Sequence, residues 1–123
     1  MILVDTSIWI DHLHRGDDAL AALLARDEVL THPFIIGELA LGSLRRRDFV
    51  LRALYRLPGA NVARHDEVMQ MITREKLSGL GIGYIDVHLI AATRITPDAL
   101  LWTRDRRLAA AAGQLSLSAP VVH

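Results

Sequence analysis

The chain begins with a short, unbroken apolar run that ends on an acid. In the opening segment MILVDTSIWI, Ile2, Leu3 and Val4 directly precede Asp5. A continuous apolar run is typical of a strand buried on both faces, since a strand with one face in water would alternate apolar and polar residues. Such a strand must lie inside a sheet that is covered on both sides, and this requirement strongly limits the fold.

The rest of the chain alternates short strands with helices. We expect strands at 2–4, 29–31 and 99–102, and helices near 6–14, 17–26, 33–42, 45–57, 66–80 (with Asp66 as its N-cap), 85–94 and up to Gly113. Short strands are also expected at 61–63 and in the tail LSLSAPVVH. Strands alternating with helices predict a parallel sheet with helices on both faces. The predicted fold class is therefore α/β, a three-layer sandwich with a central, mostly parallel sheet, in one domain spanning residues 1–123.

Composition excludes several classes of protein. The chain has no cysteine, which rules out disulfides and thiolate metal sites. No segment approaches the ~20 consecutive apolar residues of a membrane helix, and the N-terminus lacks the pattern of a signal peptide. We therefore expect a cytoplasmic protein without membrane association.

The charges cancel formally, with 14 basic and 14 acidic residues. All but one of the basic residues are arginines, and they cluster at 45–47 and again at 104–107. If four acids were drawn into one metal site, an excess of four positive charges would remain on the surface. That excess would favour a phosphate-bearing partner, because arginine suits phosphate geometry. A solvated, salt-bridged surface is the alternative, and composition does not separate the two.

Two acids follow predicted strands. Asp5 comes after the strand at 2–4, and Asp105 comes after the strand in LLWTRD. In open parallel sheets, ligands bind beyond the carboxyl ends of the strands. An aspartate between a strand and a helix is also a preferred N-cap, so both interpretations stay open for each residue.

Two further acids lie on apolar helix faces. The helical neighbours of Glu38 include Phe34, Ile35 and Leu41, and Asp86 lies within the apolar segment YIDVHLI. A buried carboxylate is unfavourable unless it is paired or binds a metal. The alternatives are that Glu38 reaches water from the edge of its face and that Asp86 caps a helix.

The four acids together favour a metal site over four separate explanations. Clustered carboxylates repel one another, so bringing them together requires a compensating cation. With no cysteine and no histidine pair at helical i, i+4 spacing, the available ligands are hard oxygens. Such ligands indicate Mg²⁺ or Mn²⁺ rather than Zn²⁺.

Four segments in a fixed order also resemble a known family. They are MILVDTSIWID, the mid-chain Glu38 on an apolar helix, GIGYIDVHLIAA and LWTRDRRL. Together they resemble a PIN-domain ribonuclease, specifically a VapC-type toxin of a bacterial type II toxin–antitoxin system. The resemblance covers essentially the whole chain. Each motif is weak alone, and the four in order are specific.

The resemblance implies a site and an activity. Carried over residue by residue, the acidic constellation of the family falls on Asp5, Glu38, Asp86 and Asp105. It implies an endoribonuclease dependent on Mg²⁺ or Mn²⁺ that leaves a 5′-phosphate and a 3′-hydroxyl. Asp5 and Asp86 are the first choices for direct metal ligands, while Glu38 and Asp105 bind directly, bind through water or position a second ion. The family further implies a homodimer held inactive by a cognate antitoxin, in a heterotetramer or a larger assembly.

Hydroxyl groups and arginines complete the predicted site. Thr6 matches the hydroxyl residue that follows the first acid of the family, and Thr103 matches the small polar residue two before its last acid. We expect both to donate hydrogen bonds that orient carboxylates. Arg104, Arg106 and Arg107 are candidates for contacts with RNA phosphates, or else they only solvate the start of a helix.

Two other functions remain as alternatives. A phosphoacceptor receiver-like signalling domain shares the length, the alternation and the strand-end acids. Such domains typically carry a paired acid near the first strand and a lysine after the last one, whereas Asp5 stands alone here and Lys76 lies in the helical segment TREKL. A non-catalytic binding module is the second alternative, which cleavage of RNA only with divalent metal would exclude.

Overall fold

The computed structural model describes residues 1–121 of the chain. Within this range the elements follow in the order β1 (Ile2–Val4), α1 (Thr6–Arg15), α2 (Asp18–Ala25), β2 (Val29–Leu30), α3 (Pro33–Leu41), α4 (Arg47–Arg56), α5 (His65–Arg74), α6 (Tyr84–Ile95), β3 (Leu100–Trp102) and α7 (Arg106–Gln114). The predicted alternation of short strands and helices is therefore confirmed.

The strands form one parallel sheet with β1 in the centre, in the order β2-β1-β3. Leu3 pairs with Leu30 on one side and with Leu101 on the other, and Val4 pairs with Trp102. Because all three strands run in the same direction, their carboxyl ends meet at one edge of the sheet. The residues that follow β1 and β3 are thereby placed side by side.

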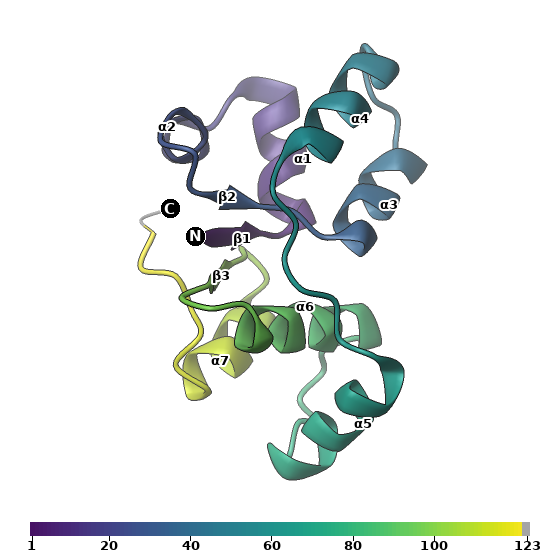
Figure 1. The fold of residues 1–123 in the computed structure, drawn as a ribbon, viewed down its shortest axis with the longest axis vertical. Helices are drawn as coiled ribbons and strands as arrows, with labels where there is room; N and C mark the ends of the chain where they lie inside the picture. Colours follow the sequence, from purple (N-terminus) through teal and green to yellow (C-terminus); the bar gives the residue numbers. More distant parts are fainter. Residues whose placement is uncertain (122–123) are drawn as a thin grey trace.

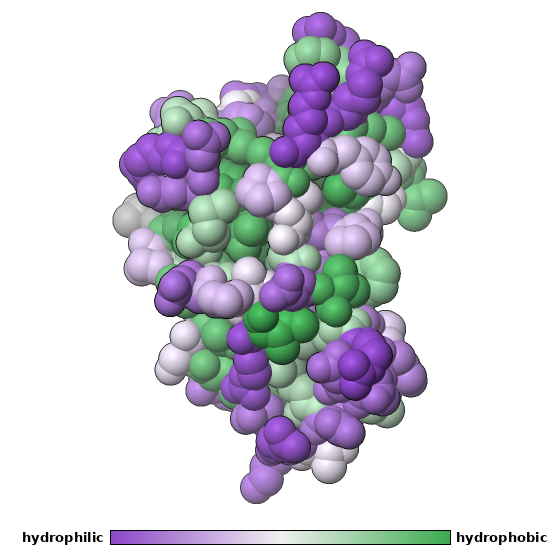
Figure 2. Space-filling model, viewed as in Figure 1, coloured by the Kyte–Doolittle hydropathy of each residue, from purple (hydrophilic) through white to green (hydrophobic). Residues whose placement is uncertain are grey.

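Helices cover both faces of the sheet, which confirms the predicted α/β sandwich. Helices α1 to α4 lie on one side of the sheet, and α5 to α7 lie on the other (Figure 1). Strongly hydrophilic side chains gather over α4 at the top of the same view, and again over α2 and α5 (Figure 2). Among the described residues, no helix is both long enough and apolar enough to span a bilayer.

The core explains why the strands are apolar without alternation. Leu3 and Val4 have no exposed surface, and Leu101 and Trp102 are each 1% exposed. Residues of opposite pleat orientation are therefore equally buried, as expected for a sheet between two helical layers. The helices contribute further fully buried side chains, including Ile8, Leu20, Ile35, Leu89, Ile90 and Leu108.

The predicted strand at 61–63 is wrong. The chain pairs with the sheet slightly earlier, where Thr31 donates a backbone hydrogen bond to Pro58 (2.9 Å) and accepts one from Ala60 (2.8 Å). Asn61 instead binds the end of α6: its side-chain amide donates to the carbonyl of Ile95 at 2.9 Å. Asn61 therefore hydrogen-bonds to a carbonyl at the end of α6, which has no partner within the helix, in place of pairing with a strand.

The helix predicted at 66–80 is shorter and starts earlier than expected. Arg64, not Asp66, is the N-cap of α5, and its backbone N–H donates to the Glu67 carboxylate at 2.9 Å. Asp66 lies within the first turn, where a negative charge is favourable. The helix ends at Arg74 because Lys76 adopts a left-handed φ of 56° and Leu77 donates back to the carbonyl of Ile72.

The tail expected as a last strand makes one isolated parallel bridge, between Leu101 and Ser118. Residues 122–123, which that expectation included, lie outside the described part of the chain. The other boundaries agree with the predictions within two residues.

Replacement of Leu3 by alanine tests the importance of the central strand. Leu3→Ala should lower the free energy of unfolding by about 2–5 kcal/mol, because a fully buried side chain leaves a cavity in the core. Ile10→Ala is the control, since Ile10 is 46% exposed and its loss should cost no more than about 0.5 kcal/mol. Urea denaturation followed by circular dichroism measures both variants, and equal stability of the two would contradict the described core.

Candidate active site

Asp5 is the acid held most firmly by the fold. It follows the last residue of the central strand, is 8% exposed and caps α1 by accepting from the Thr6 backbone N–H at 2.8 Å. Its other oxygen accepts from the Thr103 hydroxyl at 2.7 Å and from the Ser7 hydroxyl at 3.4 Å. Both carboxylate oxygens are therefore oriented by donors, so the direction of this side chain is set.

Glu38 reaches the same end of the sheet from the middle of α3. Its carboxylate accepts a hydrogen bond from the Thr6 hydroxyl at 3.2 Å. Burial raises the pKa of Glu38, and the negative charges of Asp5 and Asp86 raise it further, against the lowering effect of the Thr6 hydrogen bond. The interaction with two other carboxylates places Glu38 in one electrostatic group with them.

Asp86 lies in the first turn of α6 and joins the group from the opposite helical layer. Its carboxylate accepts from the Gly83 backbone N–H at 3.0 Å, in a capping box at the helix start. Burial raises the pKa of Asp86, and the negative charges of Asp5 and Asp105 add to this rise, while the bond from Gly83 opposes it. Asp86 is thus both a helix-capping residue and a member of the acidic group.

Asp105 completes the group at the start of α7. It is the N-cap of this helix and accepts from the backbone N–H groups of Arg107 (2.9 Å) and Leu108 (3.0 Å). Its own N–H donates to the Thr103 hydroxyl at 3.1 Å, and the same hydroxyl donates to Asp5. Thr103 therefore connects the two strand-end acids directly.

The structure brings the four predicted acids to one edge of the sheet, within electrostatic reach of one another. Both predicted hydroxyls also contact acids: Thr6 binds Glu38 and Thr103 binds Asp5. Ser7 is an additional contact of Asp5 that our sequence analysis did not include among the site residues. Its position two residues after a strand-end acid, where a side chain can bond back to the cap, was the available signal.

The three predicted RNA-binding arginines have different environments. The guanidinium of Arg104 forms ion pairs with Asp11 and Asp17, and its backbone N–H donates to the Ser7 hydroxyl at 3.3 Å. It therefore anchors the loop that carries Thr103 to α1 and α2. These acids raise the pKa of Arg104, and the Leu20 backbone N–H and Arg104 lower that of Asp17.

Arg106 and Arg107 lie at the exposed start of α7, beside Asp105. The side chain of Arg107 passes over Gly81, so closely that a Cβ on Gly81 would lie 2.7 Å from a guanidinium nitrogen. Gly81 also has a φ of 76°, which favours glycine. The contact of Arg106 and Arg107 with RNA phosphates stays a prediction, as does that of Arg104.

The donor set fits a hard divalent cation. The converging side chains are carboxylates with hydroxyl groups behind them, and a cation would relieve the repulsion that raises two of their pKa values. Among residues 1–121, no group of three acidic or histidine side chains is placed so that it could hold a metal ion by itself. Mg²⁺ does not need one, because it is usually held by one or two carboxylates, several waters and substrate phosphates.

Two buried histidines lie near α3 and α6 and do not add to this donor set. His32 caps α3 by accepting from the Phe34 backbone N–H through Nδ1, so its proton lies on Nε2. Burial lowers its pKa to about 4. His88 packs against the rings of Phe34 and Tyr84, and burial lowers its pKa as well. Both rings are neutral parts of the packing at neutral pH.

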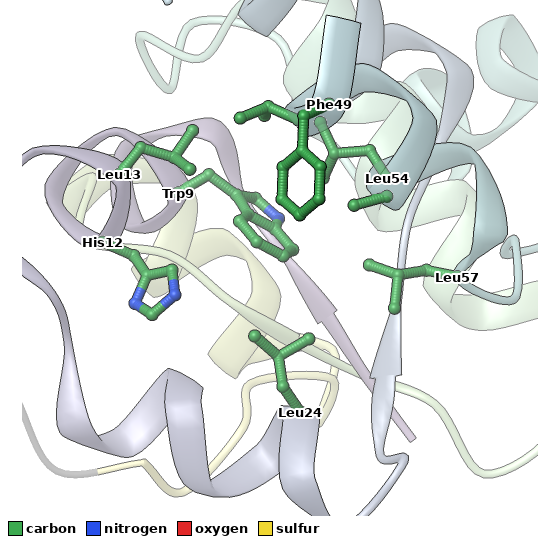
Figure 3. A pocket seen from close by; sticks show the side chains of 9 residues that line it. Trp9, His12, Leu13, Leu24, Phe49, Leu54 and Leu57 are labelled. Carbon is green, nitrogen blue, oxygen red and sulfur yellow. The ribbon is translucent and has the colours of Figure 1, made fainter. Parts of the chain in front are cut away.

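An apolar pocket lies apart from the acids, between α1, α2 and α4. It has a volume of about 220 Å³ and is lined by Trp9, His12, Leu13, Leu24, Phe49, Val50, Ala53, Leu54 and Leu57. Figure 3 shows the Trp9 indole and the Phe49 ring close together at the pocket, with Leu24 and Leu57 on its other sides. Phe49 is 54% exposed, so this pocket presents apolar surface to water.

Comparison with known proteins agrees with the geometry. The family model described as PIN domain matches residues 2–114. Ribonuclease VapC32 from two strains of Mycobacterium tuberculosis is 47% identical over 114 residues, which cover 93% of this chain and 92% of the relative. The crystal structure of FitAcB from Neisseria gonorrhoeae has the same fold, with a TM-score of 0.63 and 20% identity over 92% of this chain and 94% of that one. The chain therefore belongs to the PIN-domain family, in its group of VapC-type ribonucleases.

Proposed function

We propose that this protein is the toxin of a toxin–antitoxin pair and that it cleaves RNA with the help of Mg²⁺ or Mn²⁺ at its four-carboxylate site. The observation that carries the proposal is the set of carboxylates at the end of the central strand, in which Asp5 is fixed by Thr103 and the pKa values of Glu38 and Asp86 are raised by burial and, in addition, by neighbouring acids. Carboxylates held close together repel one another and so lower the stability of the metal-free protein, and the same negative charge favours the binding of a cation. The relative named ribonuclease supplies the substrate class.

The side chains divide the work by their positions. Asp5 and Asp86 would hold the cation directly: Asp5 follows the central strand, Asp86 lies at the start of α6, and the negative charge of Asp5 adds to the burial that raises the pKa of Asp86. Glu38 and Asp105 would bind it through water or orient the attacking water, and Thr6 and Thr103 keep their carboxylates aligned. When bound, the divalent ion lowers the pKa of a water and neutralises charge that develops on the scissile phosphate.

Partners and location follow from the same family membership. We propose a cognate antitoxin as the inhibitory partner, a homodimer as the basic unit, and the cytoplasm as the place of action. The apolar pocket between α1, α2 and α4 is suited to receive apolar side chains of such a partner, because exposed apolar surface of this kind typically marks a site of protein–protein interaction. Membership of the PIN-domain family removes the receiver-like alternative, and the first prediction below tests the non-catalytic one.

Neutralising Asp86 separates its role in the site from its role as a helix cap. Asp86→Asn should reduce Mg²⁺-dependent RNA cleavage by more than the roughly 10–100-fold typical of lost supporting contacts. The metal-free variant should be at least as stable as wild type, because repulsion is relieved and asparagine still accepts a hydrogen bond. Wild type should gain about 2.7 kcal/mol at a hundredfold excess of Mg²⁺ over its dissociation constant, and the variant clearly less.

Asp66→Asn is the matched control, since Asp66 also lies in the first turn of a helix but far from the acidic group in sequence and contacts. Thermal melts with and without Mg²⁺ and a cleavage assay measure all three proteins. Full activity and an unchanged metal response in Asp86→Asn would show that Asp86 is only a cap. Undiminished cleavage by wild type in EDTA would overturn the metal-dependent mechanism.

The raised pKa of Glu38 predicts a pH dependence with a definite sign. The folded protein binds the Glu38 proton more tightly than the unfolded chain, so the metal-free free energy of unfolding should fall as pH rises from the ordinary glutamate range through the raised pKa. Mg²⁺ affinity should rise over the same window, because the ligand must be deprotonated. Calorimetric titration of Mg²⁺ across this pH range, with urea melts alongside, measures both trends.

Two variants check that Glu38 is responsible. Glu38→Gln should reduce the pH dependence of metal-free stability and leave the part that the raised pKa of Asp86 contributes. Thr6→Val should move the window to higher pH, since the lost hydroxyl donates a bond that lowers the pKa of Glu38. An unchanged profile in Glu38→Gln would show that another group titrates.

A charged side chain in the apolar pocket should disrupt antitoxin binding without affecting cleavage. Ala53→Arg places a guanidinium among apolar side chains, so the complex with the product of the adjacent small reading frame should weaken by at least tenfold. Ala110→Arg on the exposed side of α7 is the control and should keep the complex. Co-purification and calorimetric titration measure binding, and tight binding by Ala53→Arg would place the partner elsewhere.

A further inference from the structure

The arginines are distributed very unevenly over this formally neutral chain. Residues 43–57 contain five arginines and one aspartate, a net charge of +4, so the remaining residues have nine basic and thirteen acidic side chains and a net charge of −4. We call the five arginines the α4 arginine patch; they are Arg45, Arg46, Arg47, Arg52 and Arg56. All five are exposed, and Figure 2 shows the strongly hydrophilic surface over α4 to which they contribute.

The patch is not neutralised by neighbouring acids. Within residues 1–121, the arginines that form ion pairs with carboxylates are Arg15, Arg26, Arg64, Arg94 and Arg104, all outside the patch. Arg46 lies over the ring of Phe49, 4.4 Å from its centroid, and Arg47 donates to the carbonyl of Ala40. In the described part of the chain, all five guanidinium groups therefore keep their charge available for a partner.

Two arginines of the patch lie one helical turn apart on α4. Arg52 and Arg56 are spaced i, i+4, where like charges repel. Tyr55 lies on the same face, three residues after Arg52, and is 73% exposed. Two unpaired guanidinium groups beside a bare aromatic ring match the combination that binds single-stranded nucleic acid, in which phosphates meet cations and bases stack on rings.

The patch is joined rigidly to the acidic site. Glu38 lies three residues before the end of α3, which is less than one helical turn or about 5 Å along the axis. The hydrogen bond from Arg47 to Ala40 then fastens the start of α4 to the end of α3. A strand cut beside Glu38 would meet α4 on continuing past the end of α3, and Figure 1 shows α3 and α4 on the same side of the sheet.

We propose that the α4 arginine patch binds the phosphate backbone of RNA outside the cleavage site, with Tyr55 as a platform for an unstacked base. The inference rests on the proposed ribonuclease function and extends it to a second contact surface. It accounts for the exposed aromatic ring and for the unpaired charges, and it makes α4 a determinant of which RNAs bind well.

An acidic protein is a less suitable occupant of this face. The apolar surface of α4 that would anchor a protein lies on another side of the helix, where Phe49, Ala53 and Leu57 line the apolar pocket. On the outer side, Tyr55 is accompanied by arginines and by Asp48, with no apolar cluster that could form the core of a protein interface. Recognition by charge and stacking alone is characteristic of nucleic-acid binding.

The test compares two pairs of substitutions in an Asp86→Asn background, which prevents cleavage during the measurement. The first pair, Arg52→Gln with Arg56→Gln, removes two cations of the patch. The second pair, Arg74→Gln with Lys76→Gln, removes two exposed cations of the α5 region that form no ion pair in residues 1–121. Fluorescence anisotropy with a labelled single-stranded RNA of about twenty nucleotides measures affinity over a series of salt concentrations.

The patch variant should bind RNA about tenfold more weakly at low salt, and its salt slope should fall by roughly 1.4, or about 0.7 for each lost phosphate contact. The control pair should keep the wild-type slope. Tyr55→Ala should lower affinity without changing the slope, because stacking releases no counterions. The patch variant should melt close to its parent, because exposed charges on a helix surface contribute little to stability.

The outcomes separate this inference from the proposed function. An unchanged slope in the patch variant, or equal losses in both pairs, would overturn the inference. So would a patch variant that binds RNA normally and instead loses the antitoxin. Failure of the proposed function is a different result, namely no Mg²⁺-dependent cleavage by the wild-type protein. With the active Asp86 restored, the patch variant should cleave a short oligonucleotide at the wild-type rate and show a raised KM for long RNA.

Discussion

The hydrogen bond from the Thr103 hydroxyl to the Asp5 carboxylate joins the ends of two neighbouring strands at the point where the site is built. The parallel pairing of Val4 with Trp102 places the residues that follow them, Asp5 and Thr103, side by side. Thr103 also accepts from the Asp105 backbone N–H, and Asp105 in turn caps α7. A register shift of one residue between β1 and β3 would turn one of these two side chains to the other face of the sheet, so the acidic group depends on this pairing.

Three of the four acids have a structural role in addition to their place in the acidic group. Asp5 and Asp105 cap helices and Asp86 takes part in a capping box, so the capping interpretation is confirmed for all three, while their role as metal ligands stays a prediction. A cap needs only an acceptor, which asparagine supplies equally well. The negative charge itself is therefore not explained by capping. The cost of this charge appears as raised pKa values at Asp86 and Glu38, where burial and, to a smaller extent, neighbouring acids disfavour ionisation.

The arginines show how little a net charge of zero reveals about a surface. Arg104, in the sequence cluster at 104–107, is engaged by Asp11 and Asp17 and fastens the Thr103 loop to α1 and α2. The arginines of α4 have no such partners among the described residues. Sequence proximity placed both groups in the same class, whereas acids distant in sequence distinguish them in the folded protein.

The sequence by itself determined the α/β class, the three principal strands and most helix positions, and it singled out the four acids that the fold brings together. Apolar periodicity and acids at strand ends are local signals, which is why the sequence was sufficient for these features. It did not determine that Asn61 would bind the end of α6 in place of forming a strand, or that α5 would end at Arg74, since tertiary hydrogen bonds and a left-handed residue decide these points. Only the tertiary structure showed that Ser7 and Thr103, 2 and 98 residues from Asp5 in sequence, both contact it. It also showed that Arg104 forms ion pairs, whereas Arg52 and Arg56 form none within residues 1–121. The reason is physical: the environment of a charge depends on distances between elements, and these are set by packing rather than by local sequence.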